Sequence, residues 1–279
     1  MQISIVGLAG YGARITQLLC RADIHVLGFD ADSARLEAML PEPGFEAAFT
    51  LDALLNAQLT PRIIIVATQS GKPTRLVIDE LQRKLGADDI VLLFSDEDYA
   101  RTIDDADAFR RLGIGCLDVG CVDSVQGAKE GICLMIGGDA TAVQRVERVW
   151  NALTVDPNQW LHCGPSGAGH FGKTIHDATA TTMRQAVSEG VALLAGKREF
   201  DFDTGALAEC WRHAGGVQSN ALDVIATQLR QGRAPNAASI VTPADAAQIE
   251  RAVIESARQR SATPTIAAAA MLHFGRSEK

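Results

Sequence analysis

The first half of the chain alternates short apolar runs with amphipathic stretches. Residues 2–6 alternate apolar and polar positions, a glycine-rich turn follows, and residues 13–22 carry apolar side chains at helical spacing. This pattern predicts a strand, a turn and a helix. The alternation continues, and it predicts further strands at 25–29, 62–67, 89–94, 115–119 and 132–136 and further helices at 31–40 and 140–153.

The second half of the chain has a different pattern. Beyond Gly169, alanine-rich stretches carry apolar residues at helical spacing and almost no strand signal, and they predict helices at 170–196, 204–214, 221–230, 244–260 and 265–273. Strands that alternate with helices form a mostly parallel sheet with helices on both faces. We therefore expect an α/β fold, with an N-terminal Rossmann-like doubly wound sheet at residues 1–163 and an all-helical C-terminal domain at residues 164–279.

Composition excludes several classes of protein. With 47% apolar and 22% charged residues the chain has the composition of an ordered globular protein. Its 26 Lys and Arg against 34 Asp and Glu give a net charge of −8, so nucleic acid is not an expected partner. The longest aliphatic run, residues 63–67, is far shorter than the roughly 20 residues that span a bilayer, and no signal segment is apparent, so we expect a cytoplasmic protein. The six cysteines show no C-x-x-C spacing, and we expect reduced thiols and no metal.

The glycine-rich turn predicts a dinucleotide site. Small residues between a first strand and a first helix let a pyrophosphate approach the N–H groups at the helix N-terminus. The alternative is a turn that serves only packing. The candidate residues of the turn are Gly7, Leu8, Ala9, Gly10, Tyr11 and Gly12.

Asp30 supports the dinucleotide interpretation. It ends the second predicted strand, 18 residues after Gly12, and is placed to hydrogen-bond an adenosine ribose diol. The alternative is a solvated residue at the end of a strand. Asp32 follows, and no arginine stands beside the two carboxylates, so we expect NAD(H) to be preferred over NADP(H). We also assign to the cofactor four residues that follow the strands at 62–67 and 89–94, namely Thr68, Gln69, Ser70 and Asp96.

A longer signature resembles a known family. Residues 160–171, WLHCGPSGAGHF, together with Lys173 and His176, closely resemble the signature of the 6-phosphogluconate dehydrogenases, above all their short bacterial form in the β-hydroxyacid dehydrogenase superfamily. The likeness continues at 118–120, 131–138 and 185–190 and covers nearly the whole chain. It implies a dinucleotide-binding domain, a helical domain that forms a homodimer, an active site between them and a small-molecule substrate.

The resemblance also assigns chemical roles. In that family the lysine of the G-x-G-H-x-x-K stretch takes the proton from the substrate hydroxyl as hydride leaves, and here it is Lys173. His176 would orient the substrate. Two other family residues are missing, because the glutamate that protonates the enediol is Ala180 and the tyrosine that binds phosphate is Thr181.

Further departures from the family pattern add carboxylates. The family's Ser-Gly-Gly triplet reads Val122-Asp123-Ser124, its Gly-Gly-Asn triplet reads Phe94-Ser95-Asp96, the asparagine after His176 is Asp177, and the arginine of the last helix aligns with His273. A site with fewer cations and more carboxylates disfavours a phosphate. We therefore expect a substrate other than 6-phosphogluconate, with Asp123, Ser124, Thr181 and His273 as candidate substrate-binding residues.

The remaining residues favour one direction of the reaction. On a helix, Lys173 and Asp177 share a face and His176 lies one turn from Lys173, so the three can converge on one small volume. A nearby carboxylate favours the charged form of a lysine, which suits the donation of a proton to a carbonyl or imine. We expect these three to be the catalytic residues and reduction by NADH to be the working direction. The alternative for Lys173 and Asp177 is a surface salt bridge.

Three functions are compatible with the sequence. The first is hydride transfer to or from a small hydroxy, keto or imino compound. The second is 6-phosphogluconate dehydrogenase itself, which would need Asp96 or Asp123 to replace Ala180 as the acid. The third is a non-catalytic NAD-binding sensor or assembly protein. Retention of Lys173 with His176 favours the first. For His162 and His170 we expect hydrogen-bonded or packing roles.

Overall fold

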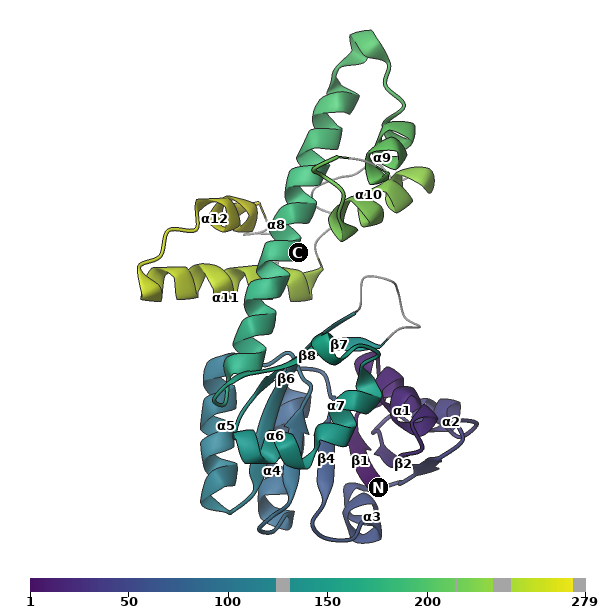
Figure 1. Ribbon diagram of the computed structural model, residues 1–279, viewed down its shortest axis with the longest axis vertical. Coiled ribbons are helices and arrows are strands. Elements are labelled where there is room, and N and C mark those ends of the chain that lie inside the picture. Colours follow the sequence, from purple (N-terminus) through teal and green to yellow (C-terminus); the bar gives the residue numbers. More distant parts are fainter. Residues whose placement is uncertain (124–130, 214, 233–241, 273–279) are drawn as a thin grey trace. The chain divides into compact units, whose positions relative to one another are not determined.

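The apolar strands of the N-terminal half form one sheet of eight strands, in the order β3-β2-β1-β4-β5-β6-β7-β8 (Figure 1). The strands are β1 Gln2–Val6, β2 His25–Phe29, β3 Phe45–Ala47, β4 Ile63–Val66, β5 Ile90–Leu93, β6 Gly115–Asp123, β7 Ile132–Gly137 and β8 Trp160–Gly164. The first six pair in parallel, β7 is antiparallel to β6, and β8 is parallel to β7. The doubly wound, Rossmann-like sheet predicted from the sequence is confirmed.

The computed structural model describes residues 1–123, 131–213, 215–232 and 242–272. The chain divides into two units, residues 1–173 and residues 174–279. The long helix α8, Ala168–Gly196, begins in the first unit and continues in the second. The domain boundary expected between residues 163 and 164 stays a prediction.

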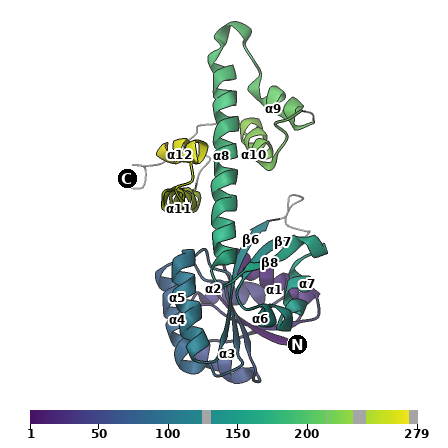
Figure 2. The ribbon, with the colours of Figure 1, turned by 60° about the vertical axis from the view of Figure 1, so that its left-hand side comes forward.

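Helices cover both faces of the sheet (Figure 2). They are α1 Tyr11–Arg21, α2 Ser33–Met39, α3 Leu51–Ala57, α4 Lys72–Lys84, α5 Tyr99–Arg111, α6 Ala140–Arg145 and α7 Glu147–Leu153. On one face Ile5 of β1 belongs to the same apolar cluster as Trp150 of α7. On the other face its neighbour Val6 belongs to a cluster with Phe109 of α5. Because the central strands are buried on both faces, their sequences are continuous apolar runs.

One predicted helix is divided. The sequence predicts a single helix at 140–153, but α6 ends before Val146 and α7 begins after it. Val146 has φ −113° and ψ 20°, outside the helical region. Its side chain is fully buried and belongs to the same apolar cluster as Trp150 of α7.

The second unit is helical throughout its described residues. Beyond α8 it contains α9 Thr204–Arg212, α10 Asn220–Arg230, α11 Pro243–Gln259 and α12 Pro264–Met271. Small apolar clusters join α8 to its neighbours: Val191 packs with Ile225 of α10, and Ala178 packs with Ile249 of α11. The predicted all-helical C-terminal domain is confirmed, whereas the expected homodimer stays a prediction.

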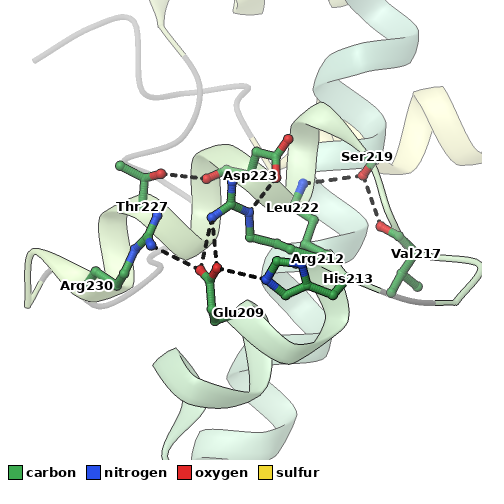
Figure 3. A network of polar contacts seen from close by, with 9 residues as sticks. All are labelled: Glu209, Arg212, His213, Val217, Ser219, Leu222, Asp223, Thr227 and Arg230. Carbon is green, nitrogen blue, oxygen red and sulfur yellow. Dashed lines mark hydrogen bonds and ion pairs between the residues drawn. The ribbon is translucent and has the colours of Figure 1, made fainter. Parts of the chain in front are cut away.

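An ion-pair network joins α9 to α10 (Figure 3). Glu209 lies 2.9 Å from Arg212, 3.3 Å from His213 and 3.1 Å from Arg230, and Arg212 also lies 2.6 Å from Asp223. The hydrogen bond from Arg212 lowers the pKa of the Glu209 carboxyl. In the described parts of the chain no helix is both long and apolar enough to span a membrane.

Candidate active site

The turn between β1 and α1 requires glycine for steric reasons. Gly7 has φ +97° and Gly10 has φ +51°, in the region that favours glycine. A Cβ on Gly12 would lie 2.0 Å from the carbonyl oxygen of Gly7, and a Cβ on Gly7 would lie 2.7 Å from the backbone of Ala67. The turn therefore brings the main chain of β1 and α1 close to the end of β4, with no side chain between them.

Helix α1 begins at this turn without a cap. Within the described part of the chain no side chain caps it, and its first turn holds no acidic residue. In contrast, Asp32, Asp98 and Asp139 accept hydrogen bonds from the first N–H groups of α2, α5 and α6. An uncapped helix N-terminus beside a glycine cradle is a site for an anion. The arrangement fits the pyrophosphate of a dinucleotide.

Asp30, directly after β2, holds the glycine turn through a hydrogen bond to its backbone. It is buried, its Oδ2 accepts a hydrogen bond from Leu8 N–H at 2.7 Å, and its Oδ1 accepts one from Asp32 N–H at 2.8 Å. Arg35 places Nη1 3.6 Å from Asp30 Oδ2 and Nε 3.3 Å from Asp32 Oδ2. The sequence argument that no arginine stands beside these carboxylates is therefore wrong, because the first turn of α2 brings Arg35 back to them.

The loops after β4 and β5 lie at the same edge of the sheet, since both strands are parallel to β1. The hydroxyl of Thr74 donates to the carbonyl oxygen of Gln69 at 2.9 Å. It also lies 2.8 Å from the hydroxyl of Thr68. Gly71 N–H donates to Glu97 Oε1 at 2.6 Å. Side chains of α4 and of the loop after β5 thus hold the segment that carries the candidate cofactor residues Thr68, Gln69 and Ser70.

Asp118 of β6 holds the beginning of α8. Its buried carboxylate accepts hydrogen bonds from Gly167 N–H at 2.7 Å and from His170 N–H at 2.9 Å. A carboxylate at a helix N-terminus stabilises the helix through its N–H groups and its dipole. The contact joins residues that are 49 and 52 positions apart in the sequence.

The first turn of α8 lies directly on the backbone of β6 and β7. A Cβ on Gly169 would lie 2.3 Å from the carbonyl oxygen of Met135 and 2.6 Å from that of Asp118. A Cβ on Gly120 would lie 2.6 Å from the carbonyl oxygen of Gly169. Gly169 and Gly120 are therefore explained by the close approach of a helix to a sheet.

His170 is a buried, hydrogen-bonded residue. Its Nε2 lies 3.1 Å from the carbonyl oxygen of Leu93, so Nε2 carries the hydrogen, and its Nδ1 lies 2.8 Å from Thr102 Oγ1. Burial lowers the pKa of the His170 imidazole, which favours the neutral ring with Nδ1 as acceptor. The packing role expected for His170 is confirmed. His162 Nε2 similarly lies 2.9 Å from the carbonyl oxygens of Gly138 and Gly164.

Lys173 follows His170 by one turn of α8. Its side chain is 10% exposed, and its Nζ lies 3.4 Å from Asp96 Oδ1, in the loop after β5. The structure thus places Asp96, assigned to the cofactor in the sequence analysis, beside the amine of Lys173. A nearly buried amine beside a carboxylate is an arrangement that can hold and deliver a proton.

The other candidate residues are on α8 in the second unit or outside the described residues, and their convergence with Lys173 stays a prediction. His176 Nδ1 lies 2.9 Å from Asp177 Oδ1, on the part of α8 that belongs to the second unit. Thr181 is fully buried, and its hydroxyl accepts a hydrogen bond from Arg184 at 3.0 Å, so it exposes no surface to a ligand. Ser124, His273 and the side chain of Asp123 lie outside the described residues.

Sequence reasoning gave no role to Asp118 or Thr102. Asp118 stands in a segment that the resemblance had singled out, but its function as a cap depends on a helix about fifty residues later in the chain. Thr102 contacts His170 across 68 positions, and no local signal reveals the pair. The described residues contain no group of three or more His, Cys, Asp or Glu side chains that could hold a metal ion.

Comparisons with known proteins identify the family of the nucleotide-binding region. A family model for the NAD binding domain of 6-phosphogluconate dehydrogenase matches residues 2–162. The chain is 29% identical over 219 residues, 78% of its own length and 72% of the relative's, to YqeC of Bacillus subtilis, which is provisionally named a 6-phosphogluconate dehydrogenase. It is 27% identical over 231 residues, 83% of its length and 76% of the relative's, to the NAD(+)-dependent, decarboxylating 6-phosphogluconate dehydrogenase of Haloferax volcanii.

Among solved structures, 3-hydroxyisobutyrate dehydrogenase (ygbJ) from Salmonella typhimurium has a similar fold. The TM-score is 0.81 at 18% sequence identity, and the match covers 99% of this chain and 94% of that one. At this level of identity the likeness concerns the fold, including the succession of a doubly wound sheet and a long helical region.

Proposed function

Because the chain belongs to the 6-phosphogluconate dehydrogenase family of nicotinamide-dependent oxidoreductases, we propose that it uses NADH to reduce a small carbonyl or imine compound other than a phosphorylated sugar acid. The observation that carries this proposal is the pair formed by Lys173 and Asp96, with 3.4 Å between Nζ and Oδ1. A carboxylate at this distance favours the ammonium form of the lysine, and only that form can donate a proton.

In this proposal, residues of the first unit bind the cofactor and donate the proton. The glycine turn at 7–12 and Asp30 would hold the dinucleotide, whose nicotinamide supplies or accepts a hydride when bound. Lys173 donates a proton from Nζ to the oxygen of a carbonyl or the nitrogen of an imine, while the carbon receives the hydride. The N–H bond of the ammonium breaks, an O–H or N–H bond forms on the product, and the neutral amine regains its proton from solvent.

Two positions in the second unit support a substrate without phosphate. Ala180 stands where the resemblance expects the acid of a decarboxylation, and Thr181 stands where it expects a phosphate-binding phenol. The hydroxyl of Thr181 is bonded to Arg184, and Arg184 in turn lies 2.8 Å from Asp245 Oδ1. A guanidinium that is already paired within its own unit is a weak ligand for a further anion.

One assay tests the reaction. The protein is first titrated with NADH, with tryptophan fluorescence as the readout, and is then supplied with NADH and a panel of small keto acids, aldehydes and cyclic imines. A parallel reaction contains 6-phosphogluconate with NAD or NADP. Reduction of a panel compound without turnover of 6-phosphogluconate supports the proposal. Turnover of 6-phosphogluconate contradicts the substrate class, and binding without any turnover favours the non-catalytic sensor.

The role of Asp96 gives a pH prediction. In Asp96→Asn the side chain keeps its size and loses its charge, so Lys173 should release its proton at lower pH. Reduction should then decline at a pH about one unit lower than in the wild type, and the optimum for oxidation should move the same way. The measurement is kcat/KM against pH in both directions.

Two further variants sharpen this measurement. Asp98→Asn removes a carboxylate two positions after Asp96 in the sequence, and asparagine can still cap α5. Because Asp98 has no part in the proposed proton transfer, the pH profile of this variant should match the wild type. Asp177→Asn tests the carboxylate that the sequence favoured and that the structure places 2.9 Å from His176. An unchanged profile in Asp96→Asn would remove Asp96 from the proposed mechanism.

The cofactor preference is also a proposal. Asp30 and Asp32 place two carboxylates at the end of β2, where an adenosine ribose would lie, and the Haloferax volcanii relative is described as NAD(+)-dependent. Like charges disfavour a 2′-phosphate at this position. We therefore propose that NAD(H) binds more tightly than NADP(H). The size of this difference in affinity depends on Arg35, whose charge offsets part of the repulsion from Asp30 and Asp32.

Asp32→Ser tests this preference. Serine keeps the cap of α2 but removes one carboxylate and frees Arg35 from an ion pair. NADP should bind about tenfold more tightly, a difference of about 1.4 kcal/mol, while the affinity for NAD changes little. The measurement is the dissociation constant of each dinucleotide by tryptophan quenching. Asp139→Ser, at the cap of α6, is the matched control, and an equal gain there would contradict the prediction.

A further inference from the structure

Polar contacts, and not packing alone, join the first turn of α8 to the sheet. Asp118 of β6 accepts hydrogen bonds from the N–H groups of Gly167 and His170. The imidazole of His170 then contacts two other elements, the carbonyl oxygen of Leu93 on β5 at 3.1 Å and the hydroxyl of Thr102 on α5 at 2.8 Å. His170 is 2% exposed, so these contacts form away from water.

The two segments joined by His170 carry the Lys173–Asp96 pair. Leu93 is the last residue of β5, and Asp96 follows it by three positions. Lys173 follows His170 by three positions on α8, which is about one helical turn. The bond from Nε2–H to the carbonyl of Leu93 therefore ties the strand end that bears the carboxylate to the helical turn that bears the amine.

We propose that His170 is a positioning residue that sets the distance between Lys173 and Asp96. This inference rests on the proposed function, in which that pair keeps the proton donor charged. His170 does not itself donate the proton, because it is buried and both of its ring nitrogens have partners within the first unit. It acts by fixing the end of β5 against α8.

The surroundings of His170 make the inference testable without loss of the fold. In His170→Phe the ring keeps similar bulk, and Asp118 keeps its bond to the backbone N–H of residue 170. The Thr102 hydroxyl also lies 3.2 Å from the carbonyl oxygen of Asp98 and can donate there instead. In His170→Gln the side-chain amide can still donate to Leu93 and accept from Thr102, so this variant serves as the conservative replacement.

The experiment measures the ionisation of Lys173 directly. The chain has six lysines, so reductive methylation with ¹³C-formaldehyde gives a simple NMR spectrum, and Lys173→Arg identifies the signal of Lys173. The midpoint of its titration is compared in the wild type and the variants. In His170→Phe the pair should separate, and the midpoint should fall by at least about half a pH unit. In His170→Gln it should stay near the wild-type value.

A distant variant separates positioning from stability. Trp150→Phe removes a buried bond from Nε1 to the carbonyl oxygen of Val143 at 3.1 Å, within the same unit. It should lower Tm about as much as His170→Phe and leave the Lys173 midpoint unchanged. If His170→Phe also lowers Tm without moving the midpoint, His170 is a structural residue only and the inference is overturned.

Two further outcomes are decided in the same way. If His170→Phe does not fold, His170→Asn takes its place: its shorter amide can reach Thr102 but not the carbonyl oxygen of Leu93, so it must lower the midpoint for the inference to stand, and an unchanged midpoint overturns it. The NMR titration needs no substrate. A shifted midpoint in a protein that reduces nothing therefore contradicts the proposed function alone, whereas reduction with an unmoved midpoint contradicts this inference alone.

Discussion

Replacing Lys173 by methionine should lower kcat for NADH-dependent reduction by about a thousandfold, with no change in the affinity for NADH. Methionine fills the space of the lysine stem, which is nearly buried, but it has no proton to donate. Asp96 loses its ion pair with Lys173 but is 43% exposed, so water can solvate the carboxylate and the fold should survive. The measurement is steady-state turnover with a compound identified by the substrate panel, together with an NADH titration.

The matched control for this variant is Lys197→Met. Lys197 is an exposed lysine that lies 3.3 Å from Glu199, so its removal should leave turnover unchanged. Wild-type turnover in Lys173→Met would mean that the proton comes from another group. Loss of NADH affinity in Lys173→Met would mean that Lys173 serves the cofactor and not the substrate.

Replacing Gly169 by alanine should destabilise the protein by about 3 kcal/mol. The new Cβ would lie 2.3 Å from the carbonyl oxygen of Met135 and 2.6 Å from that of Asp118. Both atoms belong to the backbone of paired strands and cannot turn aside as a side chain could. The first turn of α8 would have to move away from the sheet, and His170 and Lys173 would move with it.

Gly190→Ala provides the comparison within the same helix. Among the residues that the structure describes, a Cβ on Gly190 would meet no atom within 4 Å beyond the neighbouring backbone of α8. Alanine has the higher helix propensity, so this variant should be more stable than the wild type by up to about 1 kcal/mol. Urea unfolding followed by circular dichroism gives both values. A Gly169→Ala protein as stable as Gly190→Ala would disprove the close approach of α8 to β6 and β7.

The strands of the sheet could be predicted where burial on both faces produces an apolar run. Residues 63–66 of β4 and 90–93 of β5 are of this kind. β3 has only three residues, and β8 alternates half-buried with exposed positions at the edge of the sheet, so neither gives a strong signal. The break at Val146 was missed because helical spacing continues across it.

The candidate site was predictable where its chemistry is local. The glycine turn and Asp30 follow from the pattern of the first two strands and the turn between the first strand and its helix. Lys173 follows from the family signature that begins at residue 160. The ion pair of Lys173 with Asp96 was not predictable, because Asp96 lies 77 positions earlier in the sequence and the sheet brings the two together. Arg35 could have been found, since the cap at Asp32 begins a helix whose first turn brings Arg35 back to Asp30.

The division of the chain falls inside α8, immediately after Lys173. The proposed proton donor therefore belongs to the same unit as the sheet, whereas Ala180 and Thr181, two positions at which this chain departs from the phosphate-binding pattern, belong to the other unit. Under the proposed function, substitutions in residues 174–279 leave Lys173, Asp96 and the glycine turn unchanged, because all three belong to the other unit.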